Sequence, residues 1–151
     1  MMKKIFLIVL FFVSSCGYQP IYVNNTTKNY EFKKIIFSGD NYINKKIINI
    51  LSIKENDKIE NKNELFLLSS YNIEEVSKNS KGQVELYKST ITLNLKIKNI
   101  NNETVRNKDF VKEFTYNTKQ NKFDLTEYQR SIKDNLINEI ISDTVIFLNL
   151  E

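Results

Sequence analysis

Hydrophobic and polar residues alternate most regularly between residues 87 and 98 of the chain. Alternation with a period of two predicts a β-strand that buries one face and leaves the other in water. The apolar face would carry Tyr87, Ile91, Leu93, Leu95 and Ile97, and the polar face Lys88, Thr90, Thr92, Asn94, Lys96 and Lys98.

Two further segments predict strands on either side of this one. Before it, Asn79-Ser80-Lys81-Gly82 is typical of a hairpin turn. After it, residues 99–102 lead into a third strand at residues 105–116. The apolar positions of one parity are Leu65, Leu67, Tyr71 and Ile73 in the first segment and Phe110, Phe114 and Tyr116 in the last.

Helical spacing of apolar residues predicts a helix near each end of this strand region. Residues 30–37 are β-prone and end at the turn Ser38-Gly39-Asp40, after which a helix is expected over residues 41–52. Asp124-Leu125-Thr126-Glu127 predicts a capping box that begins a long final helix. The order β-α-β-β-β-α predicts an α+β fold with two helices packed on one face of a four-stranded, mostly antiparallel sheet. The apolar stripe of the last helix, which favours core packing over a cofactor site, is Leu125, Tyr128, Ile132, Leu136, Ile140 and Thr144, broadened by Ile137, Ile141 and Leu148.

The N-terminal segment predicts export and lipidation. Lys3 and Lys4 precede a short apolar run at residues 5–13, which is the layout of a secretory signal and is too short to span a membrane. Ser14 and Ser15 before Cys16 resemble the bacterial lipobox, which implies a diacylglycerol on the Cys16 thiol and cleavage before it. The alternative is an ordinary signal with an incidental cysteine, but an unpaired thiol is a liability in an oxidising compartment. The expected organisation is a signal at residues 1–15, a lipidated tether at residues 16–29 and one domain at residues 30–151.

Composition argues against several functional classes. The chain of 151 residues has no histidine and one cysteine, so the usual metal sites and catalytic triads lack their main residues. Three scattered glycines cannot form a phosphate-binding loop. Without Lys3 and Lys4, 20 basic residues face 18 acidic ones with no basic run, so nucleic acid is not indicated as a partner. We therefore expect neither an enzyme nor a bound cofactor or metal.

The segment from Cys16 to Tyr22, Cys-Gly-Tyr-Gln-Pro-Ile-Tyr, together with the element order, resembles the lipopolysaccharide-assembly lipoprotein family (LptE). The resemblance implies a lipid-anchored plug inside a large outer-membrane β-barrel (LptD), which the plug helps to fold. Together they would insert lipopolysaccharide into the outer leaflet. Gly17 also favours the outer membrane, because an aspartate at that position resembles an inner-membrane retention signal in enteric bacteria.

Lys88, Lys96 and Lys98 are candidate ligands for lipopolysaccharide phosphates, because they share the polar face of one strand. The alternative for this face is simple solvation. Arg106 and Lys108 add charge on the next strand but share a parity with Phe110. Two other functions remain open: an auxiliary lipoprotein of an ABC-type envelope lipid transporter, and a purely structural envelope lipoprotein.

The lipid anchor is tested by the change Cys16→Ser, which removes the thiol that takes the diacylglycerol. Cells fed radioactive palmitate should label the wild-type protein and leave the variant unlabelled, as an uncleaved or soluble precursor. Continued labelling of the variant would show that the lipid is attached elsewhere and that Cys16 is not the anchor.

Overall fold

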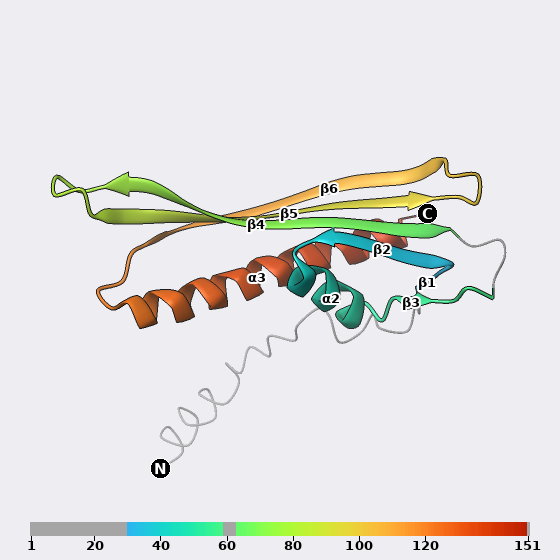
Figure 1. Ribbon diagram of the computed structural model, residues 1–151, viewed down its shortest axis with the longest axis horizontal. Coiled ribbons are helices and arrows are strands. Elements are labelled where there is room, and N and C mark those ends of the chain that lie inside the picture. The colour runs from blue at the N-terminus through green and yellow to red at the C-terminus, as the bar shows by residue number, and fades with distance from the viewer. Residues whose placement is uncertain (1–29, 59–62, 151) are drawn as a thin grey trace, which may run out of the picture.

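The computed structural model describes residues 30–58 and 63–150, which form a layered α+β domain (Figure 1). The main sheet has the order β2-β4-β5-β6, formed by Lys34–Gly39, Glu64–Lys78, Val84–Lys98 and Thr104–Asn117. β2 runs parallel to β4, and the other two neighbouring pairs are antiparallel. A small parallel sheet joins β1 (Glu31–Phe32) to β3 (Lys54–Glu55).

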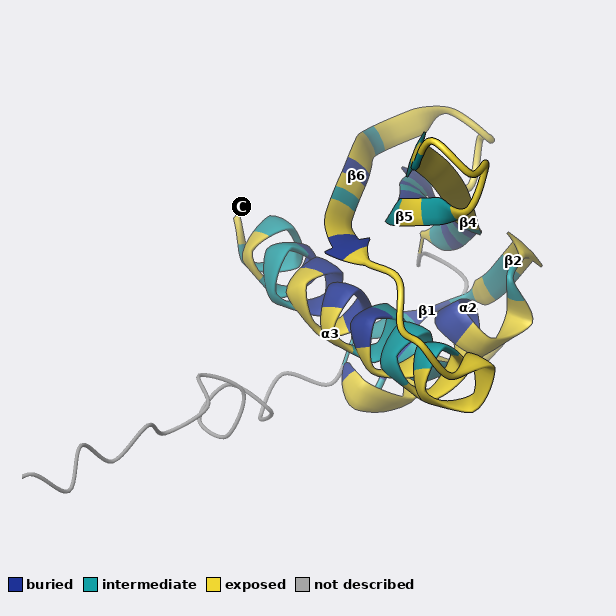
Figure 2. Ribbon diagram, turned by 90° about the vertical axis from the view of Figure 1, so that its left-hand side faces the viewer, coloured by how far each residue is buried: buried dark blue, intermediate teal, exposed yellow. Residues whose placement is uncertain are grey.

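Both helices lie on the same face of the main sheet, as the sequence predicts (Figures 1 and 2). α2 (Asn41–Ile50) connects the parallel strands β2 and β4, and α3 (Lys122–Asn149) runs beneath β5 and β6. The expected helix over residues 41–52 ends two residues earlier, with Ser52 in a left-handed conformation (φ 51°). The first expected strand, residues 30–37, is divided between β1 and β2, which belong to different sheets.

The core fills the space between the helices and the inner face of the sheet. Leu93, near the middle of β5, is 1% exposed. The odd-numbered positions of β5 from Ser89 to Ile97 are buried, as the alternation predicts, and the even-numbered ones are only half-buried. The fully buried apolar side chains are Ile43, Ile47, Leu65, Leu67, Ile91, Leu93, Leu95, Ile137, Ile140 and Ile141.

Two turns of the same design join the long strands. The side chain of Asn79 accepts hydrogen bonds from the backbone N–H groups of Lys81 and Gln83 at 2.9 and 3.0 Å. Asn99 repeats this pattern in the β5–β6 turn. In both turns the fourth residue has a left-handed φ, 77° at Gly82 and 63° at Asn102, which glycine and asparagine tolerate best.

The predicted capping box at Asp124 is wrong. α3 begins at Lys122, and the N-cap is Asn121, whose side chain accepts the Phe123 N–H at 2.8 Å. Asp124 instead lies in the first helical turn, where a negative charge still favours the helix dipole. Glu127, the other end of the predicted box, forms an ion pair with Arg130 at 3.1 Å.

Candidate functional site

The face of the main sheet that points away from the helices is open along its whole length (Figure 1). On β5 this face carries the polar residues of the alternating pattern, and the register brings side chains of β4 and β6 beside them. We call this surface the open face. Its members are Glu64, Phe66, Leu68, Ser70, Asn72 and Glu74 on β4, the even-numbered residues Lys88–Lys98 on β5, and Asn107, Asp109, Val111, Glu113 and Thr115 on β6.

Polar side chains in the middle of the open face pair with one another across the strands. The hydroxyls of Ser70 and Thr92 lie 2.8 Å apart. The Asn94 amide donates to Asp109 at 2.6 Å and to Asn107 at 3.0 Å. Such cross-strand pairs stabilise the sheet and occupy hydrogen-bonding groups that would otherwise face only solvent. The middle of the open face is therefore polar but largely satisfied within itself.

Lys88 does not belong with the other two candidate lysines. Its ammonium group lies 3.3 Å from a carboxylate oxygen of Glu74 and 4.0 Å from one of Glu113, so two carboxylates flank this single charge. Eight residues of strand, about 26 Å, separate it from Lys96. The structure thus leaves Lys96 and Lys98 together at one end of β5 and Lys88 paired at the other.

Lys96 and Lys98 lie next to the half-buried Phe66, with the exposed Leu68 two residues farther along β4. The Lys98 ammonium group is 5.0 Å from the centre of the Phe66 ring and donates to Asn102 at 2.8 Å. Lys96 is the register neighbour of Phe66 and makes no hydrogen bond or ion pair within the described residues. We call this end of the open face the basic–apolar corner; it comprises Lys34, Ile36, Phe66, Leu68, Lys96 and Lys98, with Glu64 between Lys34 and Lys98.

The alternating pattern does not predict the apolar half of this corner, although the sequence of β4 carries a signal for it. Leu65-Phe66-Leu67-Leu68 is a continuous apolar run, so it must place apolar side chains on both faces of β4. Leu68 is 53% exposed. An open surface that combines ammonium groups with apolar side chains suits a ligand that carries both phosphate and hydrocarbon.

The basic residues of β6 lie on the helix side of the sheet, in agreement with their parity. The Arg106 guanidinium stacks over the Phe147 ring, 4.2 Å from its centre, and donates to the Phe147 carbonyl. Lys112 forms an ion pair with Asp143 at 2.9 Å. These charges attach α3 to the edge strand, so they are not part of the open face.

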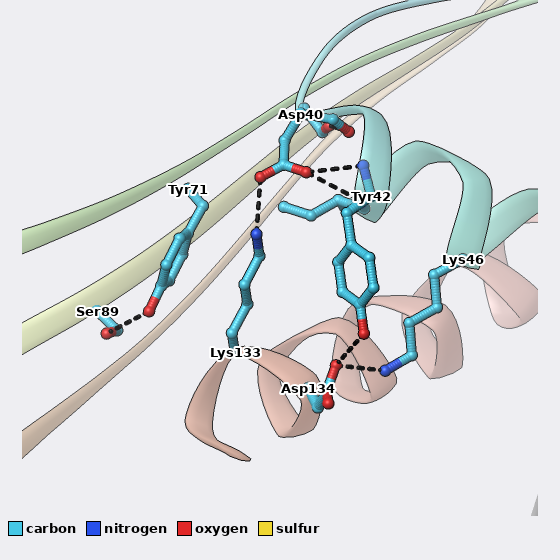
Figure 3. Close-up of polar contacts among 9 residues, drawn as sticks. Asp40, Tyr42, Lys46, Tyr71, Ser89, Lys133 and Asp134 are labelled. Carbon is cyan, nitrogen blue, oxygen red and sulfur yellow. Dashed lines mark hydrogen bonds and ion pairs between the residues drawn. The ribbon is translucent and has the colours of Figure 1, made fainter. Parts of the chain in front are cut away.

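A polar clamp fastens the start of α2 to the middle of α3 (Figure 3). The Lys133 ammonium group reaches Asp40 at 2.8 Å between the rings of Tyr42 and Tyr71, whose centres are 5.2 and 4.7 Å away. Asp40 also caps α2 by accepting the backbone N–H groups of residues 42 and 43. On the other side, Asp134 accepts from Lys46 at 2.6 Å and from the Tyr42 hydroxyl at 2.8 Å.

The clamp changes the acidity of both carboxyls. Burial acts to raise the pKa of Asp40, but the hydrogen bonds from Lys133 and the α2 backbone and the Lys133 charge outweigh it, so the pKa is lowered. Asp134 behaves alike: burial acts to raise its pKa, and the hydrogen bonds from Lys46 and Tyr42 lower it overall. Both groups are therefore ionised in the folded protein at neutral pH.

Within residues 30–58 and 63–150 no group of three or more acidic, cysteine or histidine side chains is arranged to hold a metal ion. None of the helices in this part of the chain is long and apolar enough to cross a membrane. Cys16 and Gly17, and with them the predicted signal and tether, lie outside the described residues.

No protein-family model matches the chain, and no curated protein matches its sequence. Solved structures do share its fold. Rare lipoprotein B from Shewanella oneidensis superposes with a TM-score of 0.55 at 11% identity, covering 75% of this chain and 90% of that one. An uncharacterized lipoprotein B from Nitrosomonas europaea gives 0.55 at 6% identity, covering 84% and 88%. At such low identity the likeness establishes a common fold and nothing more.

The clamp predicts a loss of stability in acid. The unfolded chain holds protons on Asp40 and Asp134 more tightly than the folded one, so unfolding takes up protons as the pH falls through about 4. The clamp's contribution is complete above this range and disappears below the lowered pKa values. The melting temperature should therefore drop between pH 5 and pH 3.

A double variant isolates the clamp from general acid effects. Asp40→Asn with Asp134→Asn keeps the helix cap but cannot titrate, so its melting temperature should change less than that of the wild type between pH 5 and pH 3. The control, Asp57→Asn with Glu85→Gln, removes two exposed carboxylates that make no ion pair within the described residues and should follow the wild type. Equal pH profiles for all three proteins would contradict the clamp.

Proposed function

We propose that this chain is an outer-membrane lipoprotein, anchored through Cys16 on the periplasmic side, that plugs an LptD-type β-barrel. In this role it assists assembly of the barrel and takes part in inserting lipopolysaccharide into the outer leaflet. The observation that carries the proposal is a sheet whose second face is uncovered by the described residues and carries paired polar groups across its middle, on a domain that follows a lipobox-like cysteine.

Two further findings support the proposal. The fold is shared over most of both chains with rare lipoprotein B of Shewanella oneidensis and with lipoprotein B of Nitrosomonas europaea, whose names make them lipoproteins. The segment Cys16–Tyr22 resembles the opening of the lipopolysaccharide-assembly lipoproteins. The N-terminal motif carries the family resemblance, and the shared fold is compatible with it without assigning a family by itself.

The open face has the chemistry that a barrel plug requires. The lumen of a large outer-membrane barrel is polar and holds water, so a domain inside it needs a surface that tolerates water beside other polar groups. Across the middle of the open face, Ser70 pairs with Thr92, and Asn94 with Asp109. A surface whose polar groups are already paired loses little when water is displaced from it.

The basic–apolar corner is the part of this face suited to lipopolysaccharide. Lys96 has no partner within the described residues, and Lys98 is held by a neutral asparagine side chain and an aromatic ring. Both ammonium groups can therefore pair with phosphate without first breaking an ion pair. Phe66 and Leu68 offer apolar area beside them. Lys88, flanked by two carboxylates, does not offer the same attraction.

Charge removal at the corner should weaken binding of purified lipopolysaccharide. Lys96→Gln with Lys98→Gln should raise the Kd at least tenfold, about 1.4 kcal/mol, and reduce the salt dependence that phosphate pairing gives to the wild type. The control, Lys81→Gln with Lys88→Gln, removes two charges from the other end of the sheet and should change the Kd less than twofold. Equal losses in both variants would assign binding to net charge rather than to the corner.

The barrel partner is tested in cells by depletion of the chain. Without its plug the barrel should assemble incompletely, so the amount of folded barrel in the outer membrane and the lipopolysaccharide on the cell surface should both fall. Re-expression of the wild-type chain should restore both. If barrel assembly stays normal after full depletion, the plug role is wrong, and a role with an ABC-type lipid transporter becomes the first alternative.

A further inference from the structure

A hollow of about 170 Å³ lies between β6 and the middle of α3, on the helix side of the sheet. The buried side chains of Ile132 and Leu136 line it and make its floor apolar. The rings of Phe114 on β6 and Tyr128 on α3 also line it. We call this feature the α3 hollow.

Phe114 gives the α3 hollow an aromatic wall that its neighbours hold in place. Tyr116 stacks with Phe114, with the ring centres 6.4 Å apart and the ring planes at 12°. Tyr87 continues the stack on β5, 5.8 Å from Tyr116, and Tyr128 meets Tyr116 edge to face at 5.6 Å. Phe114 nevertheless remains 47% exposed. An exposed ring that is already fixed offers a flat surface to a ligand with little further loss of side-chain freedom.

Three polar side chains of α3 line the same hollow, namely Ser131, Asn135 and Glu139. They are spaced four residues apart, so they form one stripe about 12 Å long on the helix. All three are exposed, and none makes a side-chain hydrogen bond or ion pair within the described residues. Glu139 only adds its charge to the surroundings of Lys112, whose pKa is raised first by the hydrogen bond to Asp143. The stripe therefore offers a hydroxyl, an amide and a carboxylate to a ligand.

This lining argues against two common kinds of ligand. The Glu139 carboxylate repels phosphate, and none of the described residues that line the hollow carries a positive charge. A hydrocarbon chain would take the three polar side chains out of water without giving them partners, which costs free energy. The ligand must therefore combine an apolar surface with neutral hydrogen-bonding groups.

We propose that the α3 hollow binds one pyranose ring of a glycan. The C–H groups on one side of a pyranose are weakly positive and the face of an aromatic ring is negative, so the sugar packs flat against Phe114. Sugar hydroxyls both donate and accept hydrogen bonds, as do the Ser131 hydroxyl and the Asn135 amide, while Glu139 accepts. A volume of about 170 Å³ is about six times the share of one liquid water molecule, which suits a single monosaccharide better than the larger ligands that fill about 300–1,000 Å³.

The α3 hollow is separate from the basic–apolar corner. Phe114 is seven residues along β6 from Asn107, the register neighbour of Lys96, so about 23 Å of strand lie between the two sites. They also lie on opposite faces of the sheet. In the cell envelope, where the proposed function places the chain, pyranose rings come from the sugar part of glycolipids and from the cell wall. The binding chemistry itself needs neither the lipid anchor nor the barrel.

Saturation-transfer NMR tests the site on the purified chain in a phosphocholine detergent, which carries no sugar. The probes are methyl β-D-glucopyranoside and chitobiose, the disaccharide of N-acetylglucosamine. A ligand of about a dozen non-hydrogen atoms reaches a Kd of about 1 mM, and the strongest saturation should fall on the C–H hydrogens of one ring face. Inorganic phosphate should not displace the sugars. Absence of saturation transfer to both sugars would overturn the proposal.

Matched variants show whether the α3 hollow is the site. Phe114→Leu stays apolar but loses the ring, so the Kd should rise about fivefold or more. Phe123→Leu removes a ring that is 70% exposed in the first turn of α3 and does not line the hollow, so the Kd should stay unchanged. Asn135→Ala should also raise the Kd about fivefold, and Asn101→Ala, in the β5–β6 turn, should not. Unchanged melting temperatures verify that the variants fold. Equal Kd values within each matched pair would overturn the assignment to the hollow.

Competition identifies the source of the sugar. Displacement of the probe by the delipidated core oligosaccharide of lipopolysaccharide would assign the ring to the glycolipid, and displacement by a muropeptide would assign it to the cell wall. Either result supports the site, and failure of both to displace the probe would count against it. No barrel takes part in the assay, so a negative result leaves the plug role standing, and loss of the plug role leaves the sugar titration unaffected.

Discussion

The structure depends on the one-sided burial of β5. Its odd-numbered side chains from Ser89 to Ile97 are buried beneath the helices, while its even-numbered ones stay half-buried on the other side. Because neighbouring residues of a strand point to opposite faces, burying one set fixes the other at the open surface. Both helices must then pack on the buried face of the sheet. The register of β4 and β6 with β5 places their side chains on the same two faces, one toward the helices and one open. A charged side chain in place of Leu93 would unfold the domain. An unpaired buried charge costs several kcal/mol, and the total free energy of unfolding of a domain is about 5–15 kcal/mol.

The functional surfaces follow from that division. On the helix side, ion pairs connect the helices with each other and with the sheet: Lys133 with Asp40, Lys46 with Asp134, and Lys112 with Asp143. On the open face, polar side chains pair with one another across the strands. At the end near β2, ammonium groups without an ion pair in the described residues lie beside apolar side chains. The domain therefore combines a packed core, a polar open face and one corner where ammonium groups lie beside apolar side chains.

Regular periodicity made much of the fold predictable from the sequence. The alternation in β5, the turns at Asn79 and Asn99 and the apolar stripe of α3 are local patterns, and each was confirmed. The parallel pairing of β2 with β4 and the division of the first strand at Lys33 depend on partners far away in the sequence. The predicted start of α3 was wrong because Asn121, three residues before Asp124, is also a good N-cap residue. A helix capped by Asn121 begins about one turn earlier.

The candidate site was predictable only in part, because its chemistry depends on register. The alternation correctly put three lysines on the open face, but it could not show that Glu74 and Glu113 flank Lys88. The clamp around Lys133 likewise unites residues about 90 positions apart, which no local pattern reveals.

The most direct test of the account is to purify the tagged, lipidated chain from detergent-solubilised outer membranes and identify what accompanies it by mass spectrometry. A plug should bring down one large outer-membrane β-barrel in roughly equal amount, and the complex should survive moderate salt because the middle of the open face carries paired polar groups rather than free charges. Recovery of an inner-membrane ATPase complex instead, or of the chain without any stoichiometric partner, would contradict the account.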